Sequence, residues 1–230
     1  MQLGLLTALN EERAARRAAI VVTELLSGEQ RLVRAADIPK DEMHGALKKR
    51  LRSGRSGIEE TERGKYFLTV FVPPPRLVVT GAVHISQELA PMAQRLGYDV
   101  VIVDPRTAFA TPERFAGIRL LADWPDKVLP GLAIDPHTAF CALTHDPKID
   151  DPALLHALAK DCFYVGALGS KKTHAARIER LKAQGAREVQ LARIHAPIGL
   201  DIGAVSPAEI AVSILAEITA RLRLGEEYGK

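Results

Sequence analysis

Four apolar, strand-like runs in the later part of the chain each end in a short cluster of polar or glycine residues. In an open α/β sheet, ligands bind beyond the carboxyl ends of the strands, where the strand order reverses. Clusters that follow four strands would meet at one edge of the sheet, so they predict a crevice that binds a phosphate-bearing small molecule. The strand-like runs are residues 77–79, 100–103, 140–143 and 163–165, and the clusters begin at residues 81, 104, 144 and 169.

The composition, 47% hydrophobic and 26% charged over 230 residues, predicts a soluble globular protein of one large or two small domains. Lys and Arg exceed Asp and Glu by only 31 to 28 and form no long basic block, so nucleic-acid binding is not expected. No apolar stretch approaches the ~20 residues that cross a bilayer, so membrane association is not expected either.

The two cysteines, Cys141 and Cys162, are too few for a disulfide framework. The apolar start of the chain precedes its first positive charges, whereas a signal peptide carries positive charge before its apolar part. Both observations favour a cytoplasmic protein. Each cysteine lies in or beside an apolar run, and buried cysteines of this kind are typically inert.

Three consecutive prolines at 73–75 predict a stiff linker between two domains, because they fit neither a helix interior nor a central strand. Residues 1–72 are expected to form a small α+β domain, and residues 76–230 the second domain. In the first domain we expect helices at 3–17 and 41–51 and strands at 18–26, 30–35, 58–62 and 66–72.

Strand and helix patterns alternate after the linker, which predicts an α/β fold with a parallel sheet flanked by helices. Asp151-Pro152 and Ser206-Pro207 predict two helix starts, each with a capping side chain before a proline at the first helical position. Strands are expected at 76–81, 98–103, 117–121, 138–143 and 162–167, and helices near 85–96, 112–116, 125–130, 152–160, 171–184 and 207–223.

The first cluster, Gly81 to Ser86, occupies the place of a dinucleotide fingerprint, whose usual form is G-x-G-x-x-G. Val83 stands where a second glycine would let the backbone approach a pyrophosphate, which argues against a conventionally bound dinucleotide. The free amides of the following helix still suit another anion. Gly81 and Ala82 would form the turn, with His84 at the mouth of the first strand.

The second cluster is Asp104-Pro105-Arg106. Asp104 lies 23 residues beyond Gly81, close to the spacing at which a carboxylate accepts a ribose hydroxyl. The same residues suit an ordinary turn, in which Arg106 pairs with a carboxylate. The sequence leaves both interpretations open.

The third cluster places the hydroxyl, imidazole and carboxylate of Thr144, His145 and Asp146 side by side before a proline. His145 can donate a proton, bind a metal or contact a phosphate. A metal would need further ligands, and His84 could join only if the loops after the first and fourth strands adjoin. A metal-dependent hydrolase built on His84, His145 and Asp146 is one alternative. An Asx-Pro turn with an exposed histidine is the other.

The fourth cluster is a strand-to-helix loop containing Gly169, Ser170 and Lys171. Ser170 can cap the helix, and Lys171 adds positive charge beside the exposed amides, which suits a phosphate. The spacing is not that of a Walker A loop. A further segment, residues 196–204, has two glycines, a proline and a carboxylate; it suits either a loop that closes over the crevice or a passive connection.

Together these clusters resemble the XdhC/CoxI family of accessory proteins for molybdenum hydroxylases. Seven motifs occur in order and cover roughly two thirds of the chain, all from residue 73 onward. They are Pro-Pro-Pro-Arg-Leu-Val-Val at 73–79, Gly-Ala-x-His at 81–84, Asp-Pro-Arg at 104–106, Leu-Thr-His-Asp-Pro at 143–147, Tyr-Val-Gly-Ala-Leu-Gly-Ser at 164–170, Ala-Pro-Ile-Gly-Leu-Asp-Ile-Gly at 196–203 and Pro-Ala-Glu-Ile-Ala-Val-Ser-Ile at 207–214.

The resemblance implies a Rossmann-like domain behind the smaller N-terminal domain. It also implies binding of the molybdenum cofactor (molybdopterin), help with its sulfuration, and its insertion into an apoenzyme such as xanthine dehydrogenase. Two departures matter: the family's Gly-Ala-Gly-His turn has Val83 as its third residue here, and residues 1–72 contain no cysteine. A cysteine-dependent sulfur role in that domain is therefore not supported.

We interpret the chain as a cofactor-delivery chaperone rather than an enzyme, with a molybdenum hydroxylase apoenzyme as partner. A cysteine desulfurase and a second copy of the chain are further candidate partners. An NAD(P)-dependent oxidoreductase is the main rival. Ser170, Lys171 and helix amides are expected to hold the pterin phosphate, and the pterin or metal head is expected to meet the other strand-end residues. Those residues are Gly81, Ala82, His84, Asp104, Arg106, Thr144, His145, Asp146 and Gly169.

Overall fold

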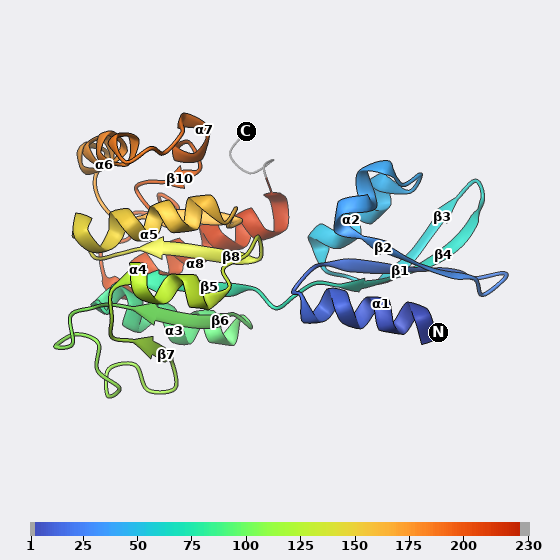
Figure 1. The fold of residues 1–230 in the computed structure, drawn as a ribbon, viewed down its shortest axis with the longest axis horizontal. Coiled ribbons are helices and arrows are strands. Elements are labelled where there is room, and N and C mark those ends of the chain that lie inside the picture. Colours follow the sequence, from blue (N-terminus) through green and yellow to red (C-terminus); the bar gives the residue numbers. More distant parts are fainter. Residues whose placement is uncertain (1–2, 226–230) are drawn as a thin grey trace. The chain divides into compact units, whose positions relative to one another are not determined.

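The computed structural model describes residues 3–225, and the chain divides into two compact units. The first unit extends to Pro73 and also includes Arg223–Gly225, whereas the second covers Pro74–Leu222. Each unit has a sheet and a hydrophobic core of its own (Figure 1).

The N-terminal unit is a four-stranded antiparallel sheet in the order β2-β1-β4-β3. Its strands alternate in burial, so that Ile20 and Val22 of β1 pack toward α2 while Ala19 and Val21 pack toward α1. Both expected hairpins are present. The elements are α1 (Leu3–Ala14), β1 (Ala19–Glu24), β2 (Gln30–Arg34), the 3-10 helix η1 (Ala35–Lys40), α2 (His44–Ser53), β3 (Gly57–Thr61) and β4 (Gly64–Phe71).

A buried carboxylate ties the first helix of this unit to its sheet. Glu12 of α1 accepts hydrogen bonds from Arg17 Nε at 2.6 Å and from Arg34 Nε of β2 at 2.9 Å. These hydrogen bonds lower the pKa of Glu12 to about 2, even though burial opposes ionisation. The ionised carboxylate therefore stabilises the folded state.

We expect Glu12→Gln to lower the free energy of unfolding by about 1–3 kcal/mol at neutral pH, because two charge-assisted hydrogen bonds are weakened. The pKa of Glu12 is lower in the folded state, so this contribution is full above the unfolded pKa near 4.5 and disappears as pH falls toward about 2. Amide hydrogen exchange of β2 across this pH range measures it. Glu11→Gln, at the exposed neighbouring position, is the control. Equal exchange rates in both variants at neutral pH would contradict the prediction.

The second unit is a six-stranded, fully parallel sheet in the order β10-β9-β8-β5-β6-β7. This is the doubly wound order of a Rossmann fold, in which the strand order reverses between the two central strands, β5 and β8. The predicted α/β, Rossmann-like fold is thus confirmed. The elements are β5 (Arg76–Thr80), α3 (His84–Arg95), β6 (Asp99–Val103), β7 (Arg119–Leu121), α4 (Pro125–Val128), η2 (Leu129–Leu132), β8 (Thr138–Ala142), α5 (Pro147–Ala159), β9 (Tyr164–Ala167), α6 (Lys171–Ala183), α7 (Glu188–Leu191), β10 (Ile194–His195) and α8 (Pro207–Leu224).

Helices cover both faces of this sheet (Figure 1). On one face, α3 and α8 pack on residues such as Leu77 and Val79. On the other, α5, α6 and α7 pack on residues such as Val78 and Phe140. Because neighbours along β5 point to opposite faces, a continuous apolar strand fills both cores.

Three local expectations for this unit need correction. Helix α5 begins at Pro147 and not at Pro152, because Asp146 caps it and the earlier start buries Ile149. Residues 112–116 form turns and not a helix; Arg114 bonds there to the carbonyl oxygens of Ala82 and Phe109, which holds the segment in that form. Strand β10 and helix α7 were not expected, since two and four residues are too few for a periodic pattern.

Candidate functional site

The predicted clusters lie at neighbouring strand ends. The pairing of β8 with both β5 and β9 sets the loops after these three strands side by side. Gly81 touches the next loop so closely that an added Cβ would lie 3.1 Å from Thr144 Cγ2. At the next strand, the Leu168 amide donates to the Ala142 carbonyl at 2.8 Å. The loops that carry His84, His145 and Ser170 therefore share one edge of the sheet.

The first two backbone amides of the turn after β5 already have hydrogen-bond acceptors within the protein. The Ala82 amide donates to Asp104 Oδ2 at 2.7 Å, and the Val83 amide donates to Ser86 Oγ at 2.9 Å. The Ser86 hydroxyl also lies 2.6 Å from the Gly81 carbonyl oxygen, so it braces the turn from inside. The next amides, from His84 onward, belong to the first turn of α3 and have no acceptor within the helix.

Asp104 supports this turn from the end of β6. Its side chain is fully buried, and its two oxygens accept from the Ala82 amide, the Arg106 amide and two Arg106 guanidinium nitrogens. Burial opposes ionisation, but the hydrogen bonds from Arg106 and Ala82 outweigh it and hold the pKa of Asp104 below its usual value. With these four partners, Asp104 positions the turn and is not placed to contact a ligand.

Arg106 is the more accessible member of this pair. Its side chain is 33% exposed and its guanidinium stacks on Phe109, 4.8 Å from the ring centroid. The hydrogen bonds to Asp104 raise the pKa of Arg106. The second cluster is thus an Asp–Arg turn, the arrangement in which Arg106 pairs with a carboxylate.

The loop after β8 combines an exposed histidine with a helix cap. His145 has a left-handed backbone (φ 63°) and an exposed side chain, and its amide donates to Asp150 Oδ2 at 3.1 Å. Asp146 caps α5 by accepting from the Lys148 amide at 2.9 Å, while the Asp146 amide donates to Thr144 Oγ1 at 3.0 Å. This is the Asx-Pro turn that the sequence left open, and it presents His145 at the edge of the sheet.

Sequence reasoning missed Asp150, which lies beneath this loop. Its side chain is buried and accepts from Thr80 Oγ1 of β5 at 2.9 Å, so it connects the two central strand ends. Burial raises the pKa of Asp150, although hydrogen bonds and the nearby Arg177 favour its ionised form. No sequence signal marks it, because Ile149-Asp150-Asp151 has the pattern of an ordinary acidic helix start.

The loop after β9 leads into α6 through the predicted cap. Ser170 Oγ accepts from the Thr173 amide at 3.2 Å, which confirms the capping role. Gly169 has φ 131° and packs closely on Thr173, so this position requires glycine. Lys171 and Lys172 follow with exposed side chains and with amides that have no acceptor within the helix.

The segment after β10 is fixed in place by a buried acid, Glu217 of α8. One Glu217 oxygen accepts from the Tyr164 hydroxyl at 2.5 Å and the Gly199 amide at 2.8 Å. The other lies 2.7 Å from His195 Nδ1, and the His195 ring stacks on Tyr164. These contacts favour the passive interpretation of residues 196–204, and no pattern in the sequence signals them.

Neither cysteine is available for chemistry. Burial raises the pKa of Cys162 to about 12 and that of Cys141 further, so both remain thiols at neutral pH.

Within residues 3–225, no group of three or more His, Cys, Asp or Glu side chains is arranged to hold a metal, which leaves the hydrolase alternative without support. No helix in this same range is long and apolar enough to span a bilayer.

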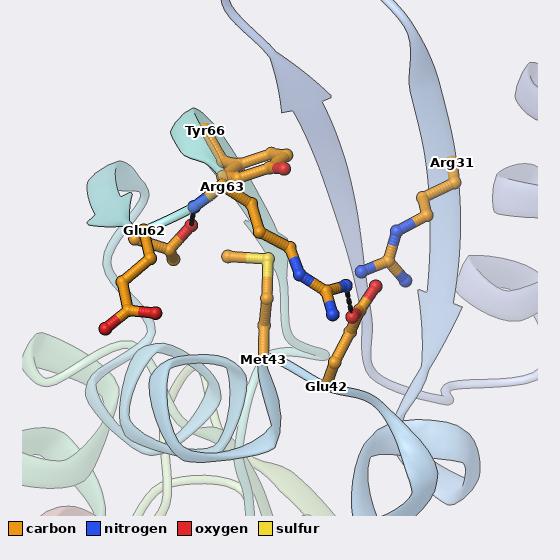
Figure 2. Close-up of a pocket in the computed structure, with 7 residues that line it drawn as sticks. Arg31, Glu42, Met43, Glu62, Arg63 and Tyr66 are labelled. Atoms are coloured by element: carbon orange, nitrogen blue, oxygen red, sulfur yellow. Dashed lines mark hydrogen bonds and ion pairs between the residues drawn. The ribbon is translucent and has the colours of Figure 1, made fainter.

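A surface hollow of about 320 Å³ lies in the N-terminal unit and contains none of the predicted site residues (Figure 2). Its two arginines already have acidic partners, since Arg63 pairs with Glu42 and Arg31 with Asp41. The hollow therefore has little uncompensated charge with which to select a ligand. Its lining is Arg31, Glu42, Met43, Thr61, Glu62, Arg63 and Tyr66.

Comparison with known proteins identifies the second unit. Residues 77–218 match the family model described as the XdhC Rossmann domain. The chain therefore belongs to the XdhC family, and the resemblance seen in its seven motifs is confirmed. A crystal structure of a xanthine dehydrogenase from Bacillus halodurans has a similar fold, with a TM-score of 0.65 and 24% identity, over 98% of this chain and 66% of that one.

Curated relatives include a protein from Bacillus subtilis described as a probable xanthine dehydrogenase component, which is 33% identical over 66% of this chain and 44% of its own length. The molybdenum cofactor insertion chaperone PaoD from Escherichia coli is 32% identical over 68% of this chain and 43% of its own length. The uncharacterized protein YqeB, also from Escherichia coli, is 33% identical over 66% of this chain and 28% of its own length. The match to this chain thus spans less than half of each relative.

The close approach of the two central loops gives a direct test of the site geometry. We expect Gly81→Ala to lower the free energy of unfolding by about 1–3 kcal/mol more than Gly97→Ala. Both glycines have positive φ, but a Cβ at Gly81 meets the Leu143–Thr144 backbone at 3.3 Å, whereas Gly97 has open space. Denaturant unfolding measures the difference, and amide shifts at Thr144 locate it. Equal losses in the two variants would show that the loops do not touch.

Proposed function

We propose that this chain binds the molybdenum cofactor as cargo at the carboxyl edge of the parallel sheet, assists its sulfuration, and delivers it to a molybdenum hydroxylase apoenzyme such as xanthine dehydrogenase. The observation that carries the proposal is the β9-β8-β5 order, which brings the loops after these three strands to one end of the sheet, at and next to the switch point. A relative named as a molybdenum cofactor insertion chaperone also supports a role in cofactor delivery.

The residues at this edge suit a molecule with a phosphate at one end and a polar ring system at the other. The α6 N-terminus has free amides, Lys171, and no acidic residue in its first turn, which suits the phosphate. The exposed imidazoles of His84 and His145 and the half-buried Arg106 offer hydrogen bonds to the head. Since β8 separates β5 from β9, the two ends of the site lie about 10 Å apart.

The expected contact side chains suit transport rather than retention. His84, His145 and Lys171 are all exposed, so the cargo would stay partly in solvent and could pass to an apoenzyme. When bound, the cofactor would bring its own molybdenum and dithiolene chemistry. The chain's residues would hold and orient it.

Sulfuration would need a cysteine persulfide on another protein as the sulfur donor, because both cysteines here are buried with raised pKa values. A cysteine desulfurase is the class of partner that supplies such sulfur. In this proposal the chain holds the cofactor while that partner modifies it, and catalyses no step alone.

An NAD(P)-dependent oxidoreductase is disfavoured by the turn after β5. The Ala82 and Val83 amides are already bonded to Asp104 and Ser86, so a pyrophosphate could not use them. The oxygens of Asp104 are also occupied, which leaves a ribose hydroxyl without its usual acceptor.

We expect purified protein to retain molybdenum cofactor through gel filtration, and Lys171→Glu and His145→Ala each to weaken retention about tenfold or more. Lys182→Glu, at the far end of α6, is the matched charge control and should bind as the wild type does. NADH under the same conditions should not be retained.

Two results would contradict the proposal. Equal retention of the cofactor by the wild type, Lys171→Glu and His145→Ala would show that Lys171 and His145 do not contribute to cofactor binding. Saturable NADH binding with no cofactor retention would favour the oxidoreductase instead.

A further inference from the structure

Arg177, in the second turn of α6, is a buried cation that the proposed site has not used. Its side chain is 2% exposed, and Nη2 donates to the Leu168 carbonyl at 2.7 Å. Nε and Nη1 are also buried, and neither has a hydrogen-bond partner among the described residues. Buried polar groups are nearly always paired, so two unpaired guanidinium nitrogens need an explanation.

The guanidinium lies directly beneath the loop that leads into α6. Leu168, which accepts its hydrogen bond, is two residues before the cap Ser170. A Cβ added to Gly169, between them, would lie 3.8 Å from Arg177 Nη2. The positive charge of Arg177 therefore lies beside the residues that immediately precede the N-terminus of α6.

The nearby carboxylates do not neutralise this charge by contact. Asp151 is paired with Arg180 at 2.6 Å, and Asp150 accepts from Thr80 and from the His145 amide. Neither forms an ion pair with Arg177 within residues 3–225, although both lie close enough to favour its charged form. Burial lowers the pKa of Arg177, and its charge is offset by Asp150 and Asp151 at longer range rather than by a direct ion pair.

The other charged side chains at the start of α6 are also positive. Lys171 and Lys172 occupy the first turn, which contains no acidic residue. Cations at the positive end of a helix dipole are unfavourable, whereas an anion there is stabilised. Two lysines, one buried arginine and the helix dipole together make an end that favours an anion of more than one charge.

We propose that Arg177 is the buried charge of a subsite for a dianionic phosphate group, such as a phosphate monoester, at the N-terminus of α6. This deepens the proposed function, on which the position of the subsite rests. Arg177 acts as a positioning residue, by holding the Leu168 carbonyl and by attracting the anion from below, while the amides and Lys171 make the contact. A singly charged carboxylate would gain less from this arrangement.

The dependence of anion binding on ionic strength should distinguish the contribution of the exposed Lys171 from that of the buried Arg177. Attraction by an exposed lysine is screened by ions, whereas attraction by a buried guanidinium is screened much less. Loss of Lys171 should therefore matter mostly at low ionic strength, and loss of Arg177 should matter at low and high ionic strength alike.

The test is a titration of the full chain with inorganic phosphate, followed through the amide NMR signals of Lys171 and Lys172, with acetate as the singly charged comparison. Arg177→Met and Arg177→Gln are expected to weaken phosphate binding about tenfold at roughly 0.05 M and roughly 0.5 M salt. Lys171→Met should weaken it mainly at the lower salt concentration. Lys182→Met, at the far end of α6, is the control and should leave binding unchanged.

Equal phosphate affinity in wild type and in a folded Arg177→Met or Arg177→Gln variant would overturn the proposal, as would equal affinity for phosphate and acetate. If both variants fail to fold, Lys171→Met decides. Binding that persists in it at roughly 0.5 M salt supports the buried charge, and complete loss there overturns it.

The Arg177 subsite and the proposed delivery function can fail independently of each other. Retention of molybdenum cofactor that is unaffected by Arg177→Gln would reject the subsite and leave the delivery function in place. Arg177-dependent phosphate binding without cofactor retention would do the reverse.

Discussion

The pairing of β5 with β8 is the constraint on which the site depends. These strands come from opposite halves of the parallel sheet and are joined through Arg76–Thr80 and Thr138–Ala142 in matched register. Their ends meet because Gly81 has no side chain to hold Thr144 away, and because the Thr80 hydroxyl and the His145 amide both bond to Asp150. One buried carboxylate therefore fixes the spacing of two loops whose anchor residues are far apart in the sequence.

The predicted parts of the fold are those that have a local signature. Strands β5, β6 and β8 are buried on both faces, and such strands give the continuous apolar runs that identified them. The cap at Ser170 was predictable because it depends only on its own helix start. Strand β10 was not, since its two residues are held by the neighbouring strand and by the contact of His195 with Glu217.

The residues missed at the site share a physical reason. Asp150, Arg177 and Glu217 all lie inside helices, where a charged residue ordinarily faces solvent. Their importance comes from partners on other elements: Thr80 for Asp150, the Leu168 carbonyl for Arg177, and Tyr164 for Glu217. Val83, by contrast, was recognisable in the sequence, because it replaces the second glycine of the dinucleotide fingerprint. The structure adds that the Val83 amide donates to Ser86, so this amide is not free to bind a pyrophosphate.

The two buried thiols have a consequence for how this chain could work beside a sulfur donor. Thiolates, not thiols, attack persulfides and are oxidised by peroxide, and neither Cys141 nor Cys162 ionises near neutral pH. Neither cysteine should thus compete for a mobile sulfane atom or react readily with peroxide. The sulfur atoms of the two cysteines instead fill the two cores on either side of the sheet.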